Sequence, residues 1–439
     1  MKKKNYLDRL WTWLCSPSSN AHNEVLDSVE VVRLGSLDVV LGLQWGDEGK
    51  GKIVDVLTPK YDTVARFQGG PNAGHSLEIN GMSGVVNQIP SGAFNPGVVL
   101  FIGNGCVVDP HAVRKDLDTI SSMGGDVSGR LFFSERAKLI LPIHIILDKF
   151  SEKQKGKDAI GSTLRGITPA YQDHCGRVGL HVGDFYKKDF TQKLTKITNF
   201  HKEMIRLQGG GEFLENFDLD ELNGSWMSAF SLSITKDMIV SYDYILRKLR
   251  QGKNVLAEGA QGSLLDIEIG DYPYVTSSHT TTAGACVGLS VPPTYVRRVY
   301  GIIKAYATRV GEGPFPGEIL NIEKAEYLRE KGHEYGATTG RKRRVGFTHL
   351  DLVLQAIRIN GVTDLFINKL DVLSDENFPL LEGDSDHPFE KIKFDKNGVP
   401  NIYGKTFISF MQEWLKENNP ETNLVGVGTS PSRDGIFYC

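Results

Sequence analysis

A glycine-rich segment, GLQWGDEGKGK (residues 42–52), has the composition of a loop that binds phosphate. From Gly46 to Lys52 it matches the pattern G-x-x-x-x-G-K, in which backbone N–H groups approach phosphate oxygens. Ile53 replaces the Ser or Thr whose hydroxyl would bind magnesium, so the magnesium ligand must come from elsewhere. Asp47 is unexpected here, because phosphate repels a carboxylate that neither binds a metal nor removes a proton. The alternative is that Asp47 only caps the next helix.

A second glycine-rich segment, FQGGPNAGHS (residues 67–76), contains Asn72 and His75. Its composition indicates backbone that lies close to a ligand, with an imidazole that can donate a proton or stabilise negative charge. A single histidine can also be purely structural. Because the segment follows a predicted strand, and ligands bind at the carboxyl ends of strands in open parallel sheets, the catalytic interpretation gains weight.

The tetrapeptide NKLD (Asn368 to Asp371) also follows a predicted strand. The Asp371 carboxylate can accept hydrogen bonds from N1–H and the exocyclic amine of guanine, while the stem of Lys369 packs over the base. Adenine offers no such pair of donors, so the motif predicts GTP as the nucleotide. The alternative is a strand end that carries surface charge.

The segment GATTGRKRRVG (residues 336–346) places four cationic residues after small ones. Such a run can be a solvated face, a localisation signal or a nucleic-acid patch. The flanking glycines and threonines favour a loop that closes over anionic ligands, and arginine suits two-pronged contacts with carboxylate or phosphate. We therefore favour a small anionic ligand over nucleic acid.

Apolar runs alternate with helical patterns along the chain, which predicts the elements that position these segments. Strands are expected at residues 37–43, 63–67, 98–103, 130–134, 254–259, 299–306 and 364–370. Helices are expected at residues 143–154 and 350–360, among others. The fold class is therefore α/β, with a large, mainly parallel central sheet, helices on both faces, P-loop-like GTP-binding elements and small antiparallel hairpin excursions. One hairpin is expected at residues 76–86, where Asn80 and Gly81 form the turn.

The chain has 439 residues, and we expect residues 35–439 to form a single domain preceded by a poorly ordered N-terminal extension at 1–34. The polar segment 374–401 is expected to be a surface excursion. A net charge of −3 gives no bulk attraction to nucleic acid or anionic membranes. Five scattered cysteines without a C-x-x-C pair indicate a reduced, cytoplasmic protein, and no run approaches the roughly 20 apolar residues of a membrane span.

Five motifs together resemble the adenylosuccinate synthetase family, whose members are GTP-dependent ligases that join IMP and L-aspartate. They are QWGDEGKGK, QGGPNAGH, EGAQGSLLDIEIGDYPYVTSS, GATTGRKRR and NKLDVL, and the resemblance runs in order from about Leu37 to the C-terminus. It leaves the N-terminal extension unexplained.

The resemblance implies a two-step reaction, the first committed step from IMP to AMP in purine nucleotide biosynthesis (EC 6.3.4.4). Asp47 is the expected proton acceptor at N1 of IMP, and His75 is the expected proton donor beside O6. O6 then attacks the γ-phosphate of GTP to form 6-phosphoryl-IMP, and the amine of aspartate displaces phosphate. Lys50 should contact phosphoryl oxygens and Gln68 should orient charge near the transferred group. One magnesium ion per subunit is expected on Asp47 and the carbonyl of Gly74.

The resemblance also implies the ligand contacts. The expected IMP contacts are Asp47, Glu48, Gly49, Lys50, Asn72, Ala73, Gly74, His75, Thr163, Arg177, Gln261, Thr276 and Arg341. The expected aspartate contacts are Ala337, Thr338, Thr339, Gly340, Arg341 and Arg343. The expected GTP contacts are Gly46, Asp47, Glu48, Gly49, Lys50, Gly51, Lys52, Gly74, His75, Ser76, Arg343, Lys369, Leu370, Asp371, Gly426, Gly428 and Thr429. Arg177 should reach the active site of a neighbouring subunit, which implies a homodimer without nucleic-acid or membrane partners.

The sequence departs from the family pattern at a few positions. Leu164 stands where many relatives have glycine, which could stiffen a loop that orders around IMP, and residues 174–179 differ around Arg177. Lys342 interrupts an otherwise all-arginine run. The alternative function is a GTP-binding switch or GTPase without ligase activity, for which only residues 46–52 and NKLD would argue.

Overall fold

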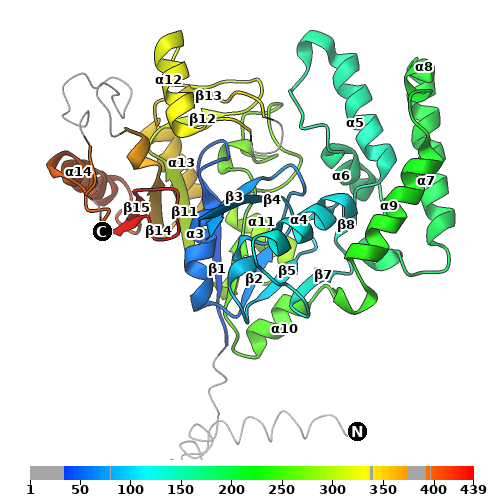
Figure 1. Cartoon of the computed structure of the whole chain (residues 1–439), viewed down its shortest axis with the longest axis horizontal. Helices are drawn as coiled ribbons and strands as arrows, with labels where there is room; N and C mark the ends of the chain where they lie inside the picture. Colours follow the sequence, from blue (N-terminus) through cyan, green and yellow to red (C-terminus); the bar gives the residue numbers. More distant parts are fainter. Residues whose placement is uncertain (1–33, 80, 337–339, 374–391, 396) are drawn as a thin grey trace, which may run out of the picture. The chain divides into compact units, whose positions relative to one another are not determined.

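The apolar runs form a ten-stranded sheet with the order β16-β15-β14-β11-β1-β10-β2-β5-β7-β9 (Figure 1). The computed structural model describes residues 34–79, 81–336, 340–373, 392–395 and 397–439. Every adjacent pair in the sheet is parallel except β15 and β16. The strands are β1 (Leu37–Gly42), β2 (Thr63–Arg66), β5 (Val99–Ile102), β7 (Leu131–Ser134), β9 (Ile239–Val240), β10 (Val255–Glu258), β11 (Val296–Lys304), β14 (Asp364–Asn368), β15 (Asn423–Gly428) and β16 (Ile436–Tyr438). The predicted mainly parallel α/β sheet is confirmed.

All seven predicted strands are present, and their boundaries differ from the prediction by up to three residues. The largest difference is in β11, which begins at Val296 rather than Val299 and ends at Lys304 rather than Tyr306. Arg297 and Arg298 near its start are charged, so the apolar pattern does not reveal where this strand begins. Arg297 there binds the carboxylate of Asp38 on β1, with Nη2 to Oδ2 at 2.6 Å.

Helices cover both faces of the sheet, because alternate strand residues point to opposite sides. Val40 belongs to one buried apolar cluster together with residues of α3, α4, α5, α7 and α9. Its neighbours Val39 and Leu41 belong to a second cluster with residues of α10 to α14. The helices are α3 (Lys50–Leu57), α4 (Pro110–Ser122), α5 (Pro142–Lys155), α6 (Ile167–Cys175), α7 (Phe190–Leu207), α8 (Gly211–Leu214), α9 (Leu219–Ser233), α10 (Tyr244–Arg250), α11 (Thr282–Leu289), α12 (Ile322–Gly332), α13 (Leu350–Asn360) and α14 (Ile402–Asn418).

Three small two-stranded sheets accompany the main sheet. The hairpin predicted at residues 76–86 is formed by β3 (His75–Ile79) and β4 (Met82–Val86), with Gly81 at φ 77° in its turn. The others pair β6 (Val107–Val108) with β8 (Lys138–Leu139), and β12 (Ala307–Arg309) with β13 (Arg344–Gly346). Most of the predicted excursion at 374–401 lies outside the described residues, as does the predicted extension except for Leu34.

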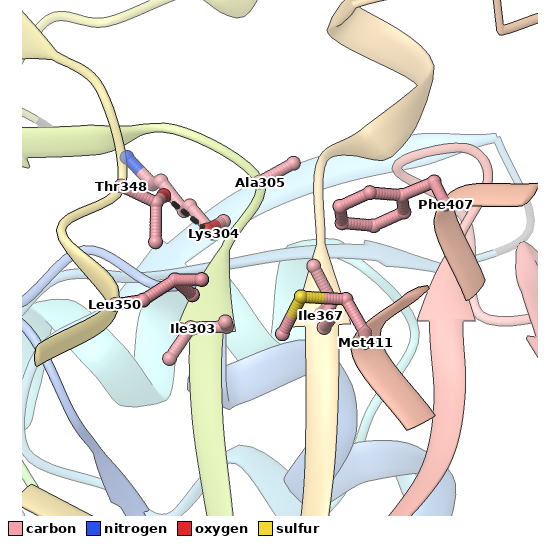
Figure 2. A pocket seen from close by; sticks show the side chains of 8 residues that line it. All are labelled: Ile303, Lys304, Ala305, Thr348, Leu350, Ile367, Phe407 and Met411. Carbon is pink, nitrogen blue, oxygen red and sulfur yellow. Dashed lines mark hydrogen bonds between the residues drawn. The ribbon is translucent and has the colours of Figure 1, made fainter. Parts of the chain in front are cut away.

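Helix α14 packs beside the carboxyl ends of β11 and β14 (Figure 2). Its Phe407 and Met411 line a small pocket with Ile303 and Ile367 of these strands. Apolar packing therefore supports, from one side, the strand ends from which the motifs project.

Five adjacent strands, β14, β11, β1, β10 and β2, end at the same edge of the sheet. The predicted phosphate loop follows β1, the histidine loop follows β2, and NKLD follows β14. The topology therefore places NKLD (residues 368–371) at the same edge as the phosphate loop (residues 42–52) and the histidine loop (residues 67–76). Within the described part of the chain, no helix combines the length and apolar character of a membrane span. The four described cysteines are all free thiols.

Candidate active site

The phosphate loop is folded around the carboxylate of Glu48. Glu48 is fully buried, and its Oε1 accepts hydrogen bonds from the backbone N–H of Gln44 (3.1 Å) and Gly46 (2.8 Å). Its Oε2 lies 2.6 Å from Nζ of Lys50. The Glu48 side chain thus shapes the loop from inside, so its predicted ligand contacts can only come from its backbone. Lys50, the predicted phosphoryl contact, is paired with Glu48.

Helix α3 begins at Lys50, within the predicted phosphate loop. Its N-cap is Gly49, at φ 82°, and no side chain caps the helix. Asp47 is therefore not the helix cap, and the alternative interpretation of Asp47 as a residue that only caps the helix is wrong. The uncapped N–H groups of the first turn remain available for phosphate oxygens.

Asp47, within the phosphate loop, has an unusual backbone conformation. Its φ is 59°, which non-glycine residues rarely adopt, and its side chain is 30% exposed. Oδ2 lies 2.8 Å from Nε of Arg343, which comes from the predicted substrate loop. The first candidate catalytic group is thus held outward and already touches the loop expected to bind aspartate.

His75, the first residue of β3, is buried against a carboxylate at the end of β10. Its Nδ1 contacts Glu258 and lies 2.8 Å from Oγ of Ser91. Ser91 also donates its N–H (2.9 Å) and its hydroxyl (2.5 Å) to Glu258. Burial lowers the pKa of His75, and the charge of Glu258 opposes that shift. These contacts leave Nε2 as the ring nitrogen that can face a ligand.

Sequence reasoning did not assign a role to Glu258, although the motif EGAQG was recognised. The signal available was a carboxylate that ends an otherwise apolar strand, NVLAE. Burial alone would raise the pKa of Glu258, but His75, Arg66 and Ser91 together hold it below its usual value. A buried ionised carboxylate of this kind needs such partners.

The loop after β10 packs directly on the other two loops. Gln68 donates Nε2 to the carbonyl of Ala260 at 2.6 Å and accepts from Oγ of Ser278 at 3.1 Å. Gln261 has φ 54°, and its buried Oε1 has no protein partner among the described residues. A Cβ at Gly46 would lie 3.5 Å from Cα of Gln261. A Cβ at Gly69 would lie 3.2 Å from Oε1 of Gln261. The backbone of Gln261 thus packs on the phosphate loop, and its unsatisfied amide oxygen lies beside the histidine loop, as an IMP contact would require.

The guanine motif is tied to the phosphate loop. Asn368 donates Nδ2 to the backbone carbonyls of Glu48 (2.8 Å) and Gly49 (3.2 Å). Lys369 has φ 61°, and its Nζ lies 2.9 Å from Oε1 of Glu334. Burial raises the pKa of Asp371.

The turn after β15 contacts both the guanine motif and helix α3. A Cβ at Gly428 would lie 2.9 Å from Oδ1 of Asn368, so this glycine packs on the guanine motif. Lys52 donates Nζ to the carbonyls of Ser430 and Gly435, each at 2.6 Å. Burial lowers the pKa of Lys52 to about 8. The predicted phosphate contact of Lys52 would therefore need it to leave these carbonyls.

The remaining predicted contacts fall into two groups. Asn72 accepts from N–H of Gly70 (3.1 Å) beside His75, and the Ala73 carbonyl accepts from a neighbouring asparagine. Arg341 donates to the carbonyl of Gly161 at 2.9 Å, which brings the substrate loop close to the segment that carries Thr163. Thr276 donates its N–H to the carbonyl of Leu265 at 2.8 Å, in the segment after β10 that also carries Gln261. By contrast, the described contacts do not join Arg177 to the loops above. Ala337, Thr338 and Thr339 lie outside the described residues.

The departures from the family pattern have structural correlates. Leu164 has φ 56°, a conformation that favours glycine, which accounts for the glycine expected there from the resemblance. Lys342 pairs with Glu326 at 2.7 Å and is largely exposed, so it lies apart from the site contacts of Arg341 and Arg343. Arg177 has φ 61° in an exposed turn after α6.

Asp47 and Gly74 fit a magnesium ion by donor type. Both offer oxygen donors, and the carboxylate is accessible, with Oδ1 outside the contact to Arg343. A pair of protein donors suits magnesium, which keeps water and substrate phosphate oxygens as its other ligands.

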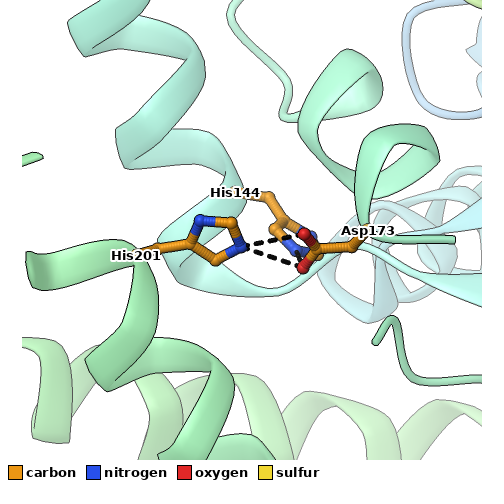
Figure 3. A group of neighbouring side chains, drawn as sticks. All are labelled: His144, Asp173 and His201. Carbon is orange, nitrogen blue, oxygen red and sulfur yellow. Dashed lines mark hydrogen bonds and ion pairs between the residues drawn. The ribbon is translucent and has the colours of Figure 1, made fainter. Parts of the chain in front are cut away.

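A second group of potential metal ligands lies among α5, α6 and α7 (Figure 3). His144 and His201 each direct Nε2 at the carboxylate of Asp173, at 2.9 Å. Nδ1 of His144 accepts the backbone N–H of Leu141 at 3.0 Å, so its Nε2 carries the proton and has no lone pair for a metal. The group is therefore a hydrogen-bonded link between helices. The backbone carbonyl of Asp173 also accepts from the N–H groups of residues 178 and 179, which fixes the turn that carries Arg177.

The model of one protein family, described as adenylosuccinate synthetase, matches residues 39–378. The chain belongs to the adenylosuccinate synthetase family. It is 49% identical over 339 residues to adenylosuccinate synthetase of Christiangramia forsetii, covering 77% of this chain and 79% of that protein. The enzyme of Flavobacterium psychrophilum is 48% identical over 339 residues, with the same coverage. The activity is thus the GTP-dependent ligation of IMP with L-aspartate in purine nucleotide biosynthesis, EC 6.3.4.4, and a GTP switch without ligase activity is not supported.

Solved structures agree with this family membership. The fully ligated adenylosuccinate synthetase of Plasmodium falciparum has a TM-score of 0.78 and 31% identity, covering 92% of this chain and all of that one. A succinoaminodeoxyadenylate synthetase of cyanophage S-2L has a TM-score of 0.61 at 20% identity, a likeness that concerns the fold alone.

Proposed function

We propose that the ligation runs through 6-phosphoryl-IMP, with Asp47 as the base and His75 as the acid. Asp47 removes the N1 proton of IMP, O6 attacks the γ-phosphorus of GTP, and the bond to the β,γ-bridging oxygen breaks to release GDP. The amine of aspartate then attacks C6, loses its proton, and inorganic phosphate leaves with O6. The observation that carries this proposal is the gathering of Asp47, His75 and the guanine motif at the ends of adjacent strands.

The neighbours of these two residues support their assigned roles. Arg343 holds Asp47 outward without occupying both oxygens, so the carboxylate can still accept a proton. Glu258 keeps a proton on Nδ1 of His75 and stabilises the charged imidazole, whose Nε2–H can donate a hydrogen bond to the negative charge that develops on O6. Lys50 and Gln68 would stabilise charge on the transferred phosphoryl group.

We further propose that Asp47 and the Gly74 carbonyl hold one magnesium ion per subunit. When bound, this ion would neutralise charge on the phosphates of GTP. Its two protein donors come from loops that follow different strands, so the ion would depend on the packing of both loops.

The binding contacts follow the same geometry. We assign IMP to the loops of Asn72 and Gln261, with Thr163, Thr276 and Arg341 around it. L-Aspartate would bind the loop 337–343, and GTP would bind the first turn of α3, Lys369, Asp371 and the turn after β15. Arg177 is exposed and makes no described contact with these loops, which supports a homodimer in which it completes the partner's site. We propose a cytoplasmic location, from the family and the free cysteines.

An omission assay tests the function directly. Protein is mixed with GTP, magnesium, IMP and L-aspartate, each component is left out in turn, and the purine absorbance spectrum and free phosphate are followed. We expect turnover only in the complete mixture. Phosphate release that continues without IMP would contradict the ligase mechanism.

Replacement of Asp371 by asparagine should weaken GTP binding rather than the chemistry. The carboxylate accepts two hydrogen bonds from guanine, and losing such charge-assisted bonds costs about 1.5–3 kcal/mol each. We expect KM for GTP to rise at least about tenfold with little change in kcat. An amide can donate to the C2 carbonyl of xanthine, so xanthosine triphosphate should become a better substrate.

The control for this variant is Asp351→Asn, an exposed aspartate in the first turn of α13. It should leave both constants unchanged. An unaltered ratio of GTP to xanthosine triphosphate use in the Asp371 variant would exclude the guanine contact.

A further inference from the structure

Glu334 places a fully buried carboxylate between the guanine motif and the substrate loop. It lies two residues beyond the end of α12, and its side chain is 0% exposed. Three cations surround it: Nζ of Lys304 at 3.0 Å from Oε2, Nζ of Lys369 at 2.9 Å from Oε1, and Nη1 of Arg343 at 2.6 Å from Oε2. The hydroxyl of Tyr306 also donates to Oε1. Every face of this carboxylate is thus occupied by a donor.

The three cations come from separate parts of the chain. Lys304 ends β11 and is itself fully buried, so it anchors the carboxylate to the sheet. Lys369 belongs to the guanine motif that follows β14. Arg343 belongs to the substrate loop and reaches Asp47 with its Nε at 2.8 Å. A continuous chain of contacts therefore runs from Lys369 through Glu334 and Arg343 to Asp47.

The charge balance makes this carboxylate indispensable to the arrangement. Burial alone would raise the pKa of Glu334, but Lys304, Lys369 and Arg343 together hold it well below its usual range. Without the negative charge, the buried cations Lys304 and Arg343 and the partly exposed Lys369 would face one another with no anion between them. Removing one member of a buried ion network leaves its partners uncompensated and forces them apart.

We infer that Glu334 is a positioning residue whose carboxylate holds the side chains of both Lys369 and Arg343 in place. Guanine recognition and the orientation of the substrate loop therefore depend on the same group. This inference rests on the roles proposed above for Lys369 and Arg343. Glu334 itself is too deeply buried to contact either substrate, so it acts through these two side chains.

The test compares KM values for all three substrates in Glu334→Gln with those in a matched control. The control is Glu318→Gln, which removes a carboxylate from the neighbouring Arg344 (Nε to Oε1, 2.8 Å) without touching the network. We expect Glu334→Gln to raise KM for GTP and for aspartate together, each about tenfold or more, while KM for IMP changes less than about threefold. Glu318→Gln should leave all three values near those of the wild type.

Glu334→Asp provides a variant that keeps the charge if the glutamine variant does not fold. Its shorter side chain should still neutralise Lys304 but reach Lys369 and Arg343 less well, so the same two KM values should rise by a smaller factor. Urea unfolding reports the stability of each variant. A rise in only one of the two KM values, or an equal rise for IMP, would overturn the inference.

The single variants Lys369→Met and Arg343→Met separate failure of this inference from failure of the proposed roles. Lys369→Met should raise KM for GTP, and Arg343→Met should raise KM for aspartate. If either constant is unchanged, the assigned role is wrong and the inference falls with it. If both rise while Glu334→Gln leaves them unchanged, the roles stand and only the inference is overturned.

Discussion

Replacement of Asp47 by asparagine should abolish phosphoryl transfer to IMP and leave the fold intact. The amide has nearly the same shape but cannot take the N1 proton, so O6 stays a poor nucleophile. We expect kcat to fall by about 10³ or more. The fold should persist because the Asp47 side chain is partly exposed and caps no helix. Exchange of isotopic oxygen in GTP between the β,γ-bridge and the β-phosphate, measured with IMP and without aspartate, reports the first step alone.

The same variant also removes the proposed magnesium ligand, and the two effects can be separated. If loss of metal affinity were the cause, raising the magnesium concentration would restore activity. If the missing base is the cause, activity stays low at saturating magnesium, while GTP and IMP still bind. Activity within a few fold of the wild type would exclude Asp47 as the base.

The sheet could be predicted because buried parallel strands leave a clear mark in the sequence. Strand β1, for example, is buried at every position and is apolar except for Asp38, since both faces are covered by helices. The polar start of β11 was missed for the converse reason, because arginines there are held by carboxylates on neighbouring strands. Local pattern thus reveals strands that are held by apolar burial, and misses the part of a strand that is held by ion pairs.

Asp47, His75, Lys369 and Asp371 were predicted from type and spacing, and the other contacts came from the family resemblance. Neither gave a role to the supporting carboxylates Glu258 and Glu334. Glu258 and Glu334 are both buried. Glu258 contacts Ser91, which is 167 residues away, and Glu334 contacts Lys369, which is 35 residues away. No spacing in the sequence marks such a contact. Glu48 shows the related difficulty: its place in the loop was predicted, but only the structure shows that its side chain turns inward.

These three carboxylates share one physical role in the site. Each is fully buried and each holds a residue that is expected to meet a substrate. Glu258 and Glu334 accept from donors on more than one element, whereas the donors to Glu48 all lie within the phosphate loop. The loops at the strand ends are therefore fixed less by apolar packing than by anions placed beneath them. Variants of these carboxylates should alter geometry and kinetics more than they alter the sheet.

Replacement of His75 by asparagine should have the second largest effect, and Glu258→Gln should reproduce part of it. Without the imidazole, no acid stands beside O6, and removal of a general acid typically costs about 10²–10⁴ in kcat. Asparagine retains a polar group that can still bond to Ser91, so the buried pocket is not left empty. Single-turnover formation of 6-phosphoryl-IMP is the measurement, and a kcat within threefold of the wild type would rule out the acid role.

Glu258→Gln tests whether the carboxylate acts through the histidine. Burial lowers the pKa of His75 and Glu258 opposes this, so loss of the charge should lower that pKa further. His75 must be protonated to act as an acid, and in the variant it loses its proton at a lower pH. The fall of activity with rising pH should therefore begin at a lower pH than in the wild type. Glu258→Asp, which keeps the charge, should move the profile back toward the wild type. A reduced kcat with an unshifted profile would mean that Glu258 only supports the fold, because a purely structural defect lowers activity equally at every pH.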